Sequence, residues 1–221
     1  MKDITLIIPA KNEPESLPKV LEELKSYNFN FNIVLHESDI KTIHSISEFK
    51  KFIIYQNDFG YGDALIEGIK KCKTKYFCIF NADGSFNPNE ISEMYNELKK
   101  NNLDIIFASR YQKNSGSEDD TAITLIGNYI FTFLGKFFFK LNITDILYTF
   151  VLGITVKVNN LNLKSSDFGF CVELPIKAKK NNLKIASIKS YERKRIAGVK
   201  KVNAFKDGYL ILKYMIKLFF K

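Results

Sequence analysis

The sequence predicts an α/β fold in which helices cover both faces of a mostly parallel central sheet. Short hydrophobic runs alternate with amphipathic helical segments through the first half of the chain. Each run ends in polar or turn-forming residues, and strands joined through helices lie parallel, with ligands bound at their C-terminal ends. Because 221 residues can bury a sizeable core, residues 1–221 are expected to form one domain.

The elements of the first half can be placed from their periodicity. A strand is predicted over Ile4–Pro9 and an amphipathic helix over Leu17–Leu24, whose apolar residues keep i, i+3, i+4, i+7 spacing. Further strands are predicted at 32–36, 52–56, 76–80 and 105–109. Helices with apolar faces near 64–72 and 91–98 precede the last two of these strands.

The second half begins with a polar stretch over 111–120, which is expected to be a loop. Two amphipathic helices are predicted after it, near 122–141 and 203–220. In the first, a polar ridge runs through Asn128, Thr132, Lys136 and Lys140; in the second, the ridge consists of Lys206, Lys213, Lys217 and Lys221. Phenylalanine and aliphatic residues cover the rest of each helix. Such helices suit a membrane interface; the alternatives are packing that leaves only lysines exposed, or a homodimer.

The composition limits the classes of ligand that this chain is expected to bind. A formal charge of +9 favours anionic ligands. Specific nucleic-acid binding is not expected, because the aromatic residues gather on the amphipathic helices rather than among the basic residues.

The compartment and the membrane topology can also be predicted from the sequence. Cys72, Cys78 and Cys171 lack metal-ligand spacing and fit a reducing cytosol. The N-terminal apolar run is too short for a signal peptide, and the longest uncharged run, 121–135, is below the roughly 18 residues of a spanning helix. No transmembrane segment is expected.

The most informative motif follows the strand predicted at 76–80. There Asn81-Ala82-Asp83 leads into a turn of Gly, Ser and Pro residues before a helix. A carboxylate at the C-terminal end of a buried strand can hold a metal ion and a phosphate-bearing ligand. Asp83 is therefore the first candidate for the chemistry.

Three more motifs join this one. Pro9-Ala10-Lys11-Asn12-Glu13 ends the first strand, a glycine run extends from Asn57 through Gly60 and Gly62 to Gly68, and the sequence YERKRIAGVKK contains Tyr191, Arg195, Gly198 and Lys201. Together the four resemble the family 2 glycosyltransferases of GT-A (Rossmann-like) fold, most closely polyprenyl-phosphate sugar synthases of the dolichyl-phosphate mannose synthase type. The resemblance covers nearly the whole chain.

The resemblance implies roles for individual residues. Residues 1–110 would bind a UDP- or GDP-sugar and 111–221 the acceptor. Asp83 and Asn81 correspond to a D-A-D motif that holds Mg²⁺ or Mn²⁺, which stabilises the charge developing on the departing nucleoside diphosphate. Asp145 would orient or deprotonate the acceptor. Substrate contacts are expected from Pro9, Glu13, Glu37, Asn57, Gly60, Gly62, Asn81, Arg110, Glu173, Arg195 and Lys201.

Departures from the family pattern keep alternatives open. Asn81 replaces a carboxylate, Glu37 replaces an Asp, Lys200 replaces a Ser, and Tyr148-Thr149-Phe150-Val151 replaces Ser-Gly-Phe-Arg. The leading function is an inverting transferase acting on a polyprenyl phosphate or a saccharide, peripheral at the cytoplasmic face of the cell membrane. A weak or silent membrane-associated relative is one alternative. A sugar-phosphate nucleotidyltransferase is another, although Pro9 to Pro14 contains no glycine for its phosphate loop.

Overall fold

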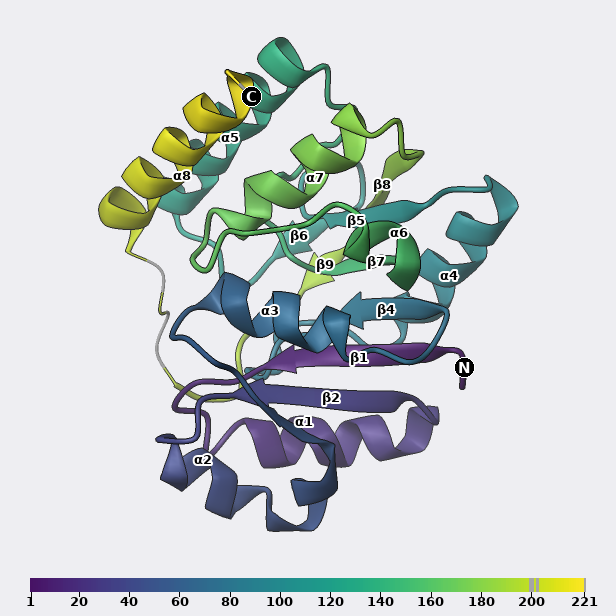
Figure 1. The fold of residues 1–221 in the computed structure, drawn as a ribbon, viewed down its shortest axis with the longest axis vertical. Coiled ribbons are helices and arrows are strands. Elements are labelled where there is room, and N and C mark those ends of the chain that lie inside the picture. The colour runs from purple at the N-terminus through teal and green to yellow at the C-terminus, as the bar shows by residue number, and fades with distance from the viewer. Residues whose placement is uncertain (199–200, 202, 221) are drawn as a thin grey trace.

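The computed structural model describes residues 1–198, 201 and 203–220 and confirms the α/β architecture, with helices on both sides of a mostly parallel sheet (Figure 1). In the described residues this sheet has seven strands in the order β3-β2-β1-β4-β7-β5-β8. The bounds are β1 Ile4–Pro9, β2 Asn30–Leu35, β3 Ile53–Tyr55, β4 Tyr76–Ile79, β5 Ile105–Ser109, β7 Val151–Ile154 and β8 Ile185–Lys189. Strand β7 runs antiparallel to both neighbours, and the other pairs are parallel.

Helices follow the strands and cover the two faces. They are α1 Leu17–Leu24, α2 Ile40–Ser45, α3 Tyr61–Lys70, α4 Glu90–Lys100, α5 Ala122–Phe139, α6 Thr155–Asn159, α7 Phe170–Lys180 and α8 Ala204–Phe219, with short 3₁₀ turns at Lys25–Tyr27 and Ser47–Phe52. Alternate residues of a strand face opposite sides. Accordingly, Leu6 and Ile8 of β1 pack with α1 and α4, whereas Ile7 packs with α3 and α7.

The strands and helices of the first half lie close to their predicted positions, but the second half contains strands that were not predicted. Strand β7 has only four residues and enters between β4 and β5, so it carries no periodic signal of its own. A two-stranded sheet pairs β6 (Gly116–Ser117), inside the stretch expected to be a loop, with β9 (Tyr191–Glu192) in the basic run. This small sheet brings the polar loop beside the basic C-terminal run.

Helix α5 packs on the domain through part of its polar ridge and exposes phenylalanines to solvent. Asn128 and Thr132 are buried, with 1% and 7% of their surface exposed, whereas Phe133 and Phe137 are 62% and 68% exposed. The Thr132 hydroxyl accepts a hydrogen bond from the Ile146 backbone N–H at 3.2 Å. Asn128 and Thr132 therefore face the domain, whereas Lys136 and Lys140 of the same ridge are exposed together with the apolar side of the helix. The alternative in which only lysines are exposed is wrong.

Helix α8 lies along α5 at one end of the molecule (Figure 1). Ile211, Met215 and Leu218 face the core, while Phe205 and Tyr209 are 81% and 67% exposed. Lys221 of the predicted ridge lies outside the described residues. Among the described residues, α5 alone is long and apolar enough to cross a membrane by length and composition. The expectation of no spanning segment stays a prediction.

Candidate active site

A cavity of about 630 Å³ lies at the C-terminal ends of β1, β2, β3 and β4. The residues directly after these strands line it, as expected for a ligand site in a parallel sheet. Of the predicted site residues, Pro9, Glu13, Gly60, Asn81, Asp83, Arg110, Arg195 and Lys201 line the cavity, whereas Glu37, Asn57, Gly62, Asp145 and Glu173 do not.

Asp83 is fixed by the turn that follows β4. Its Oδ1 atom accepts hydrogen bonds from the Ser85 backbone N–H (3.0 Å) and hydroxyl (2.7 Å), and its Oδ2 atom lies 3.9 Å from Nη2 of Arg195. The Asn81 amide oxygen accepts a hydrogen bond from the Tyr61 hydroxyl at 3.2 Å. Asp83 thus offers one carboxylate to the cavity, with a neutral oxygen donor two residues away.

These oxygen donors fit Mg²⁺ or Mn²⁺ only as partial ligands. Among the described residues, no cluster of three His, Cys, Asp or Glu side chains could hold a metal ion. Mg²⁺, however, is bound through one or two carboxylates together with substrate phosphates and retained waters. Asp83 and Asn81 match that pattern, so a metal would depend on phosphate oxygens for the rest of its shell.

The basic C-terminal run contacts the carboxylates of the cavity. Arg195 makes a two-pronged contact with Asp119, from Nε at 3.0 Å and Nη2 at 2.6 Å, and this hydrogen bonding raises the pKa of Arg195. Lys201 forms an ion pair with Glu13. Lys200, which replaces the family's Ser, lies outside the described residues. Arg195 and Lys201 therefore have carboxylate partners that an anionic ligand would have to replace.

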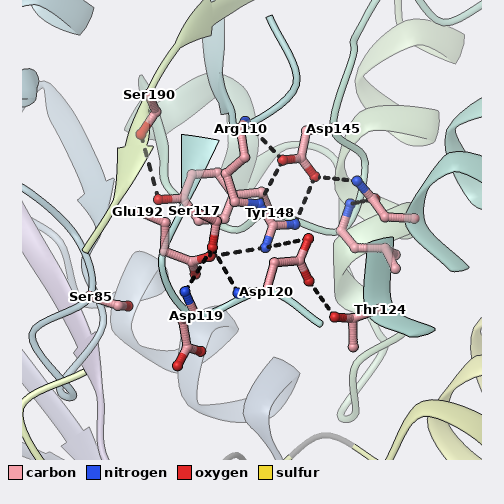
Figure 2. Close-up of polar contacts among 12 residues, drawn as sticks. Ser85, Arg110, Ser117, Asp119, Asp120, Thr124, Asp145, Tyr148, Ser190 and Glu192 are labelled. Carbon is pink, nitrogen blue, oxygen red and sulfur yellow. Dashed lines mark hydrogen bonds and ion pairs between the residues drawn. The ribbon is translucent and has the colours of Figure 1, made fainter. Parts of the chain in front are cut away.

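Arg110 lies between two buried carboxylates at the wall of the cavity (Figure 2). Its Nε and Nη2 atoms donate to Asp145 at 2.8 and 3.1 Å, and Nη1 donates to Glu192 at 3.2 Å. The Arg110 carbon Cζ lies 4.5 Å from the Tyr148 ring centroid. Burial lowers the pKa of Arg110, but Asp145 more than offsets this, so its pKa is raised and the guanidinium keeps its charge.

Asp145 does not have the geometry predicted for it. It is fully buried and outside the cavity lining. In addition to the two guanidinium bonds, it accepts hydrogen bonds from the Arg110 backbone N–H at 3.0 Å and from the Asn128 amide at 2.7 Å. These contacts hold Arg110 and leave the Asp145 carboxylate outside the cavity lining. The geometry fits positioning of Arg110 better than contact with an acceptor, and the acceptor role of Asp145 stays a prediction.

Glu173 and Gly62 lie outside the cavity lining and contact the segment 164–165. Glu173 is fully buried and accepts hydrogen bonds from the backbone N–H groups of Lys164 and Ser165 at 2.8 to 3.0 Å. A Cβ at Gly62 would come within 2.1 Å of the Ser165 carbonyl oxygen. Both residues fix the loop that carries Asp167 to the cavity.

Glu37 and Asn57 lie outside the cavity lining. Glu37 borders a separate surface hollow beside α2, and Asn57 is exposed. Asp39, two residues later, lines the cavity in the place expected for Glu37. Its Oδ2 atom accepts a hydrogen bond from the Asn12 backbone N–H at 2.6 Å, and its side chain caps α2. Asp39 lies two positions after Glu37, and β2 ends at Leu35 rather than at the predicted residue 36.

Glu192 is a cavity residue that sequence reasoning missed. It is 7% exposed and accepts hydrogen bonds from Arg110 and from the Ser117 hydroxyl. Burial raises its pKa, although Arg110 acts in the opposite direction. Its position as the acidic residue in an otherwise basic run, YERKR, was the signal that could have found it.

The chain is similar to proteins whose sequences or structures are known. The chain is 24% identical over 194 residues to an uncharacterised protein of Methanocaldococcus jannaschii, covering 84% of this chain and 79% of the relative. It is also 24% identical over 212 residues to the UDP-N-acetylglucosamine–dolichyl-phosphate N-acetylglucosaminyltransferase of Methanococcus voltae, covering 85% of this chain and 84% of the relative.

The fold is similar to that of glucosyl-3-phosphoglycerate synthase from Mycobacterium tuberculosis, solved with Mn²⁺, uridine diphosphate and phosphoglyceric acid. The TM-score is 0.68 at 11% identity, with 98% of this chain and 78% of that chain covered. This likeness confirms the predicted GT-A fold. A model of the family described as glycosyl transferase family 2 matches residues 5–159, which is more than half of the chain. The chain therefore belongs to glycosyl transferase family 2.

Proposed function

We propose that this glycosyltransferase moves a sugar, with inversion, from a UDP- or GDP-sugar to a polyprenyl phosphate or a saccharide at a membrane surface. Residues 1–110 bind the donor and 111–221 the acceptor. The observation that carries the proposal is the cavity at the strand ends, where Asp83 lies beside Arg195 and within the same lining as Lys201. A diphosphate there would meet a metal-binding carboxylate and two cations.

The charge of the cavity supports a divalent metal cofactor. Among the described residues, seven Asp or Glu and five Lys or Arg side chains line it, although the whole chain has a formal charge of +9. A diphosphate entering alone would be repelled by this local excess of carboxylates. Mg²⁺ or Mn²⁺ held by Asp83 and the Asn81 oxygen would reverse that repulsion and act as a Lewis acid on the departing diphosphate.

The chain's own cations would complete the donor site. Arg195 can exchange its two-pronged contact with Asp119 for two diphosphate oxygens, since a guanidinium forks equally well onto a carboxylate or a phosphate. Lys201 can exchange Glu13 for a third oxygen. The basic run would then close over the donor, with Asp119 and Glu13 as its resting partners.

The outward apolar faces of α5 and α8 support a peripheral position at the cytoplasmic side of the cell membrane. Lys206 and Leu210 of α8 line the cavity, whereas Phe205 and Tyr209 of the same helix are exposed. The site would therefore open beside the lipid surface, where a polyprenyl phosphate is anchored. A phosphate oxygen is already nucleophilic. A saccharide hydroxyl would need a base, and Glu192 is a cavity carboxyl whose pKa is raised by burial.

The direct test is transfer with purified protein. UDP- and GDP-sugars are offered with Mn²⁺ or Mg²⁺, with and without a polyprenyl phosphate, and the anomeric configuration of the product is read by NMR. Asp83→Asn should abolish transfer, while the exposed-surface variant Glu22→Gln should retain it. A folded protein that binds neither UDP nor GDP and transfers no sugar would refute the proposal.

Membrane contact is tested separately by flotation with vesicles containing phosphatidylglycerol. Replacing Phe133, Phe137 and Phe205 by Ser should release the protein from the vesicles. Light scattering in the absence of lipid reports the competing outcome. If the wild-type chain is a dimer that those substitutions dissociate, and if it does not float, the two helices form a homodimer interface instead.

A further inference from the structure

His36 and Phe59 form an aromatic stack that none of the roles above uses. Their ring centroids are 3.9 Å apart with an interplanar angle of 23°. His36 follows β2 and Phe59 lies in the turn after β3, and the parallel pairing of these strands brings the two side chains together. Phe59 remains 65% exposed, so burial in the core does not explain its place.

The stack belongs to the cavity, at the end away from Asp83. Both rings line it, and the order β3-β2-β1-β4 puts the end of β2 two strands away from the end of β4. At about 4.8 Å per strand, the stack and Asp83 are about 10 Å apart along the strand ends. That separation matches the reach of a nucleoside from its diphosphate to its base.

Both halves of the stack are held in place by neighbouring polar groups. The Ser38 backbone N–H donates to Nδ1 of His36 at 3.2 Å, and the Ser38 hydroxyl is 2.7 Å from the same nitrogen. Gln56 donates to the backbone carbonyls of Asp58 and Gly60, which flank Phe59. Gly60 itself has φ of +142°, and a Cβ there would lie 2.0 Å from the Ser166 carbonyl oxygen. The rings are thus preorganised before any ligand arrives.

We propose that the His36–Phe59 stack is the platform on which the nucleobase of the donor lies. This inference rests on the proposed sugar-nucleotide function and adds the residues that hold the base. A planar aromatic surface at the rim of a polar cavity binds another flat ring by offset stacking. Such stacking accepts every base, because each has a π-face, so the platform supplies affinity for the nucleoside without choosing between uracil and guanine.

The test compares ligands with and without a base. Calorimetric titration measures the binding of UDP, GDP and inorganic pyrophosphate, each with Mn²⁺, to the wild-type chain, to Phe59→Ala and to Phe59→Tyr. Phe137→Ala serves as the matched control, because Phe137 is 68% exposed and lies on α5 outside the cavity lining. Phe59 is exposed, so its replacement should leave the fold intact, which circular dichroism verifies.

Phe59→Ala should weaken binding of the preferred nucleoside diphosphate by about 5- to 160-fold, the range found when a stacking aromatic is removed, and leave pyrophosphate binding unchanged. Phe59→Tyr and Phe137→Ala should bind as wild type does. Equal loss for pyrophosphate, or no loss for either ligand, overturns the platform while leaving the proposed function intact. A wild-type chain that binds neither UDP nor GDP overturns the proposed function and the platform with it.

Discussion

The buried contact between Arg110 and Asp145 gives the sharpest prediction, because it separates a positioning role from a catalytic one. Asp145→Asn keeps the size of the side chain and removes its charge. The Asp145 side chain is fully buried and that of Arg110 is 10% exposed, so water cannot compensate for the loss. In addition, the new amide would point an N–H group at donors from Arg110 or Asn128.

The size of the effect follows from the surroundings. Removing one partner of a buried ion pair costs about 3 to 5 kcal/mol of unfolding free energy. Glu192 remains 3.2 Å from Arg110 and Asp120 remains 4.0 Å away, so part of the cationic charge stays balanced. The expected loss is therefore at the lower end, about 3 kcal/mol. In a chain of this length that corresponds to a fall in melting temperature of about 6 to 12 °C.

Urea unfolding followed by circular dichroism, together with calorimetry, measures this loss. Glu22→Gln is the control: it removes an ion pair with Lys25 whose side chains are 69% and 47% exposed, and exposed pairs contribute about 0 to 1 kcal/mol. If Asp145→Asn unfolds like the wild-type chain but loses sugar transfer, the positioning role is refuted and the residue acts on the acceptor after all.

Three further predictions concern the loop packing, the titration of Glu192 and the metal. Gly62→Ala should lower the unfolding free energy by about 1 to 3 kcal/mol in urea titrations, because the new Cβ would meet the Ser165 carbonyl at 2.1 Å; unchanged stability would contradict the tight packing. Burial raises the pKa of Glu192 above its ordinary 4.5, so the folded state holds this proton more tightly than the unfolded state, and the stabilisation is lost as pH rises from 4.5 through the folded pKa. Glu192→Gln cannot ionise, so its stability relative to wild type should increase over that interval in thermal melts; a flat difference would argue against the shift. Arg195→Gln should tighten Mn²⁺ binding in the absence of nucleotide, because Asp83 loses a cation 3.9 Å away, and weaken UDP binding; calorimetry that finds both affinities unchanged would show that Arg195 does not act at this site.

Local patterns were enough to predict the donor half of the fold. The strands Ile4–Pro9 and Ile105–Ser109 and the helix Leu17–Leu24 appear at their predicted bounds, because each has a complete hydrophobic period within a few residues. Motif position also placed Asp83 and Gly60 at the cavity. These features depend on residues that are close together in the sequence, and hydrophobic periodicity reports only such local relationships.

The features that sequence reasoning missed depend on contacts between distant residues. Asn128 shares a helical ridge with Lys136, and the ridge pattern did not distinguish its buried members from its exposed ones. Its burial follows from a partner, Asp145, that lies 17 residues away in the sequence. Likewise Asp145 occupies the expected motif position, but its guanidinium partner is 35 residues distant. Whether a polar side chain meets water or a buried charge is settled only when those segments pack together.

The hydrogen bond from Asn128 to Asp145 has a mechanical consequence. Asn128 belongs to the helix whose apolar side faces outward, and Asp145 holds Arg110 at the wall of the cavity. A sliding or rolling of α5 over the domain must either break this 2.7 Å bond or displace the carboxylate that sets the direction of the guanidinium. A movement of the outward-facing helix α5 would therefore be transmitted, through the Asn128 amide and the Asp145 carboxylate, to the guanidinium at the wall of the ligand site.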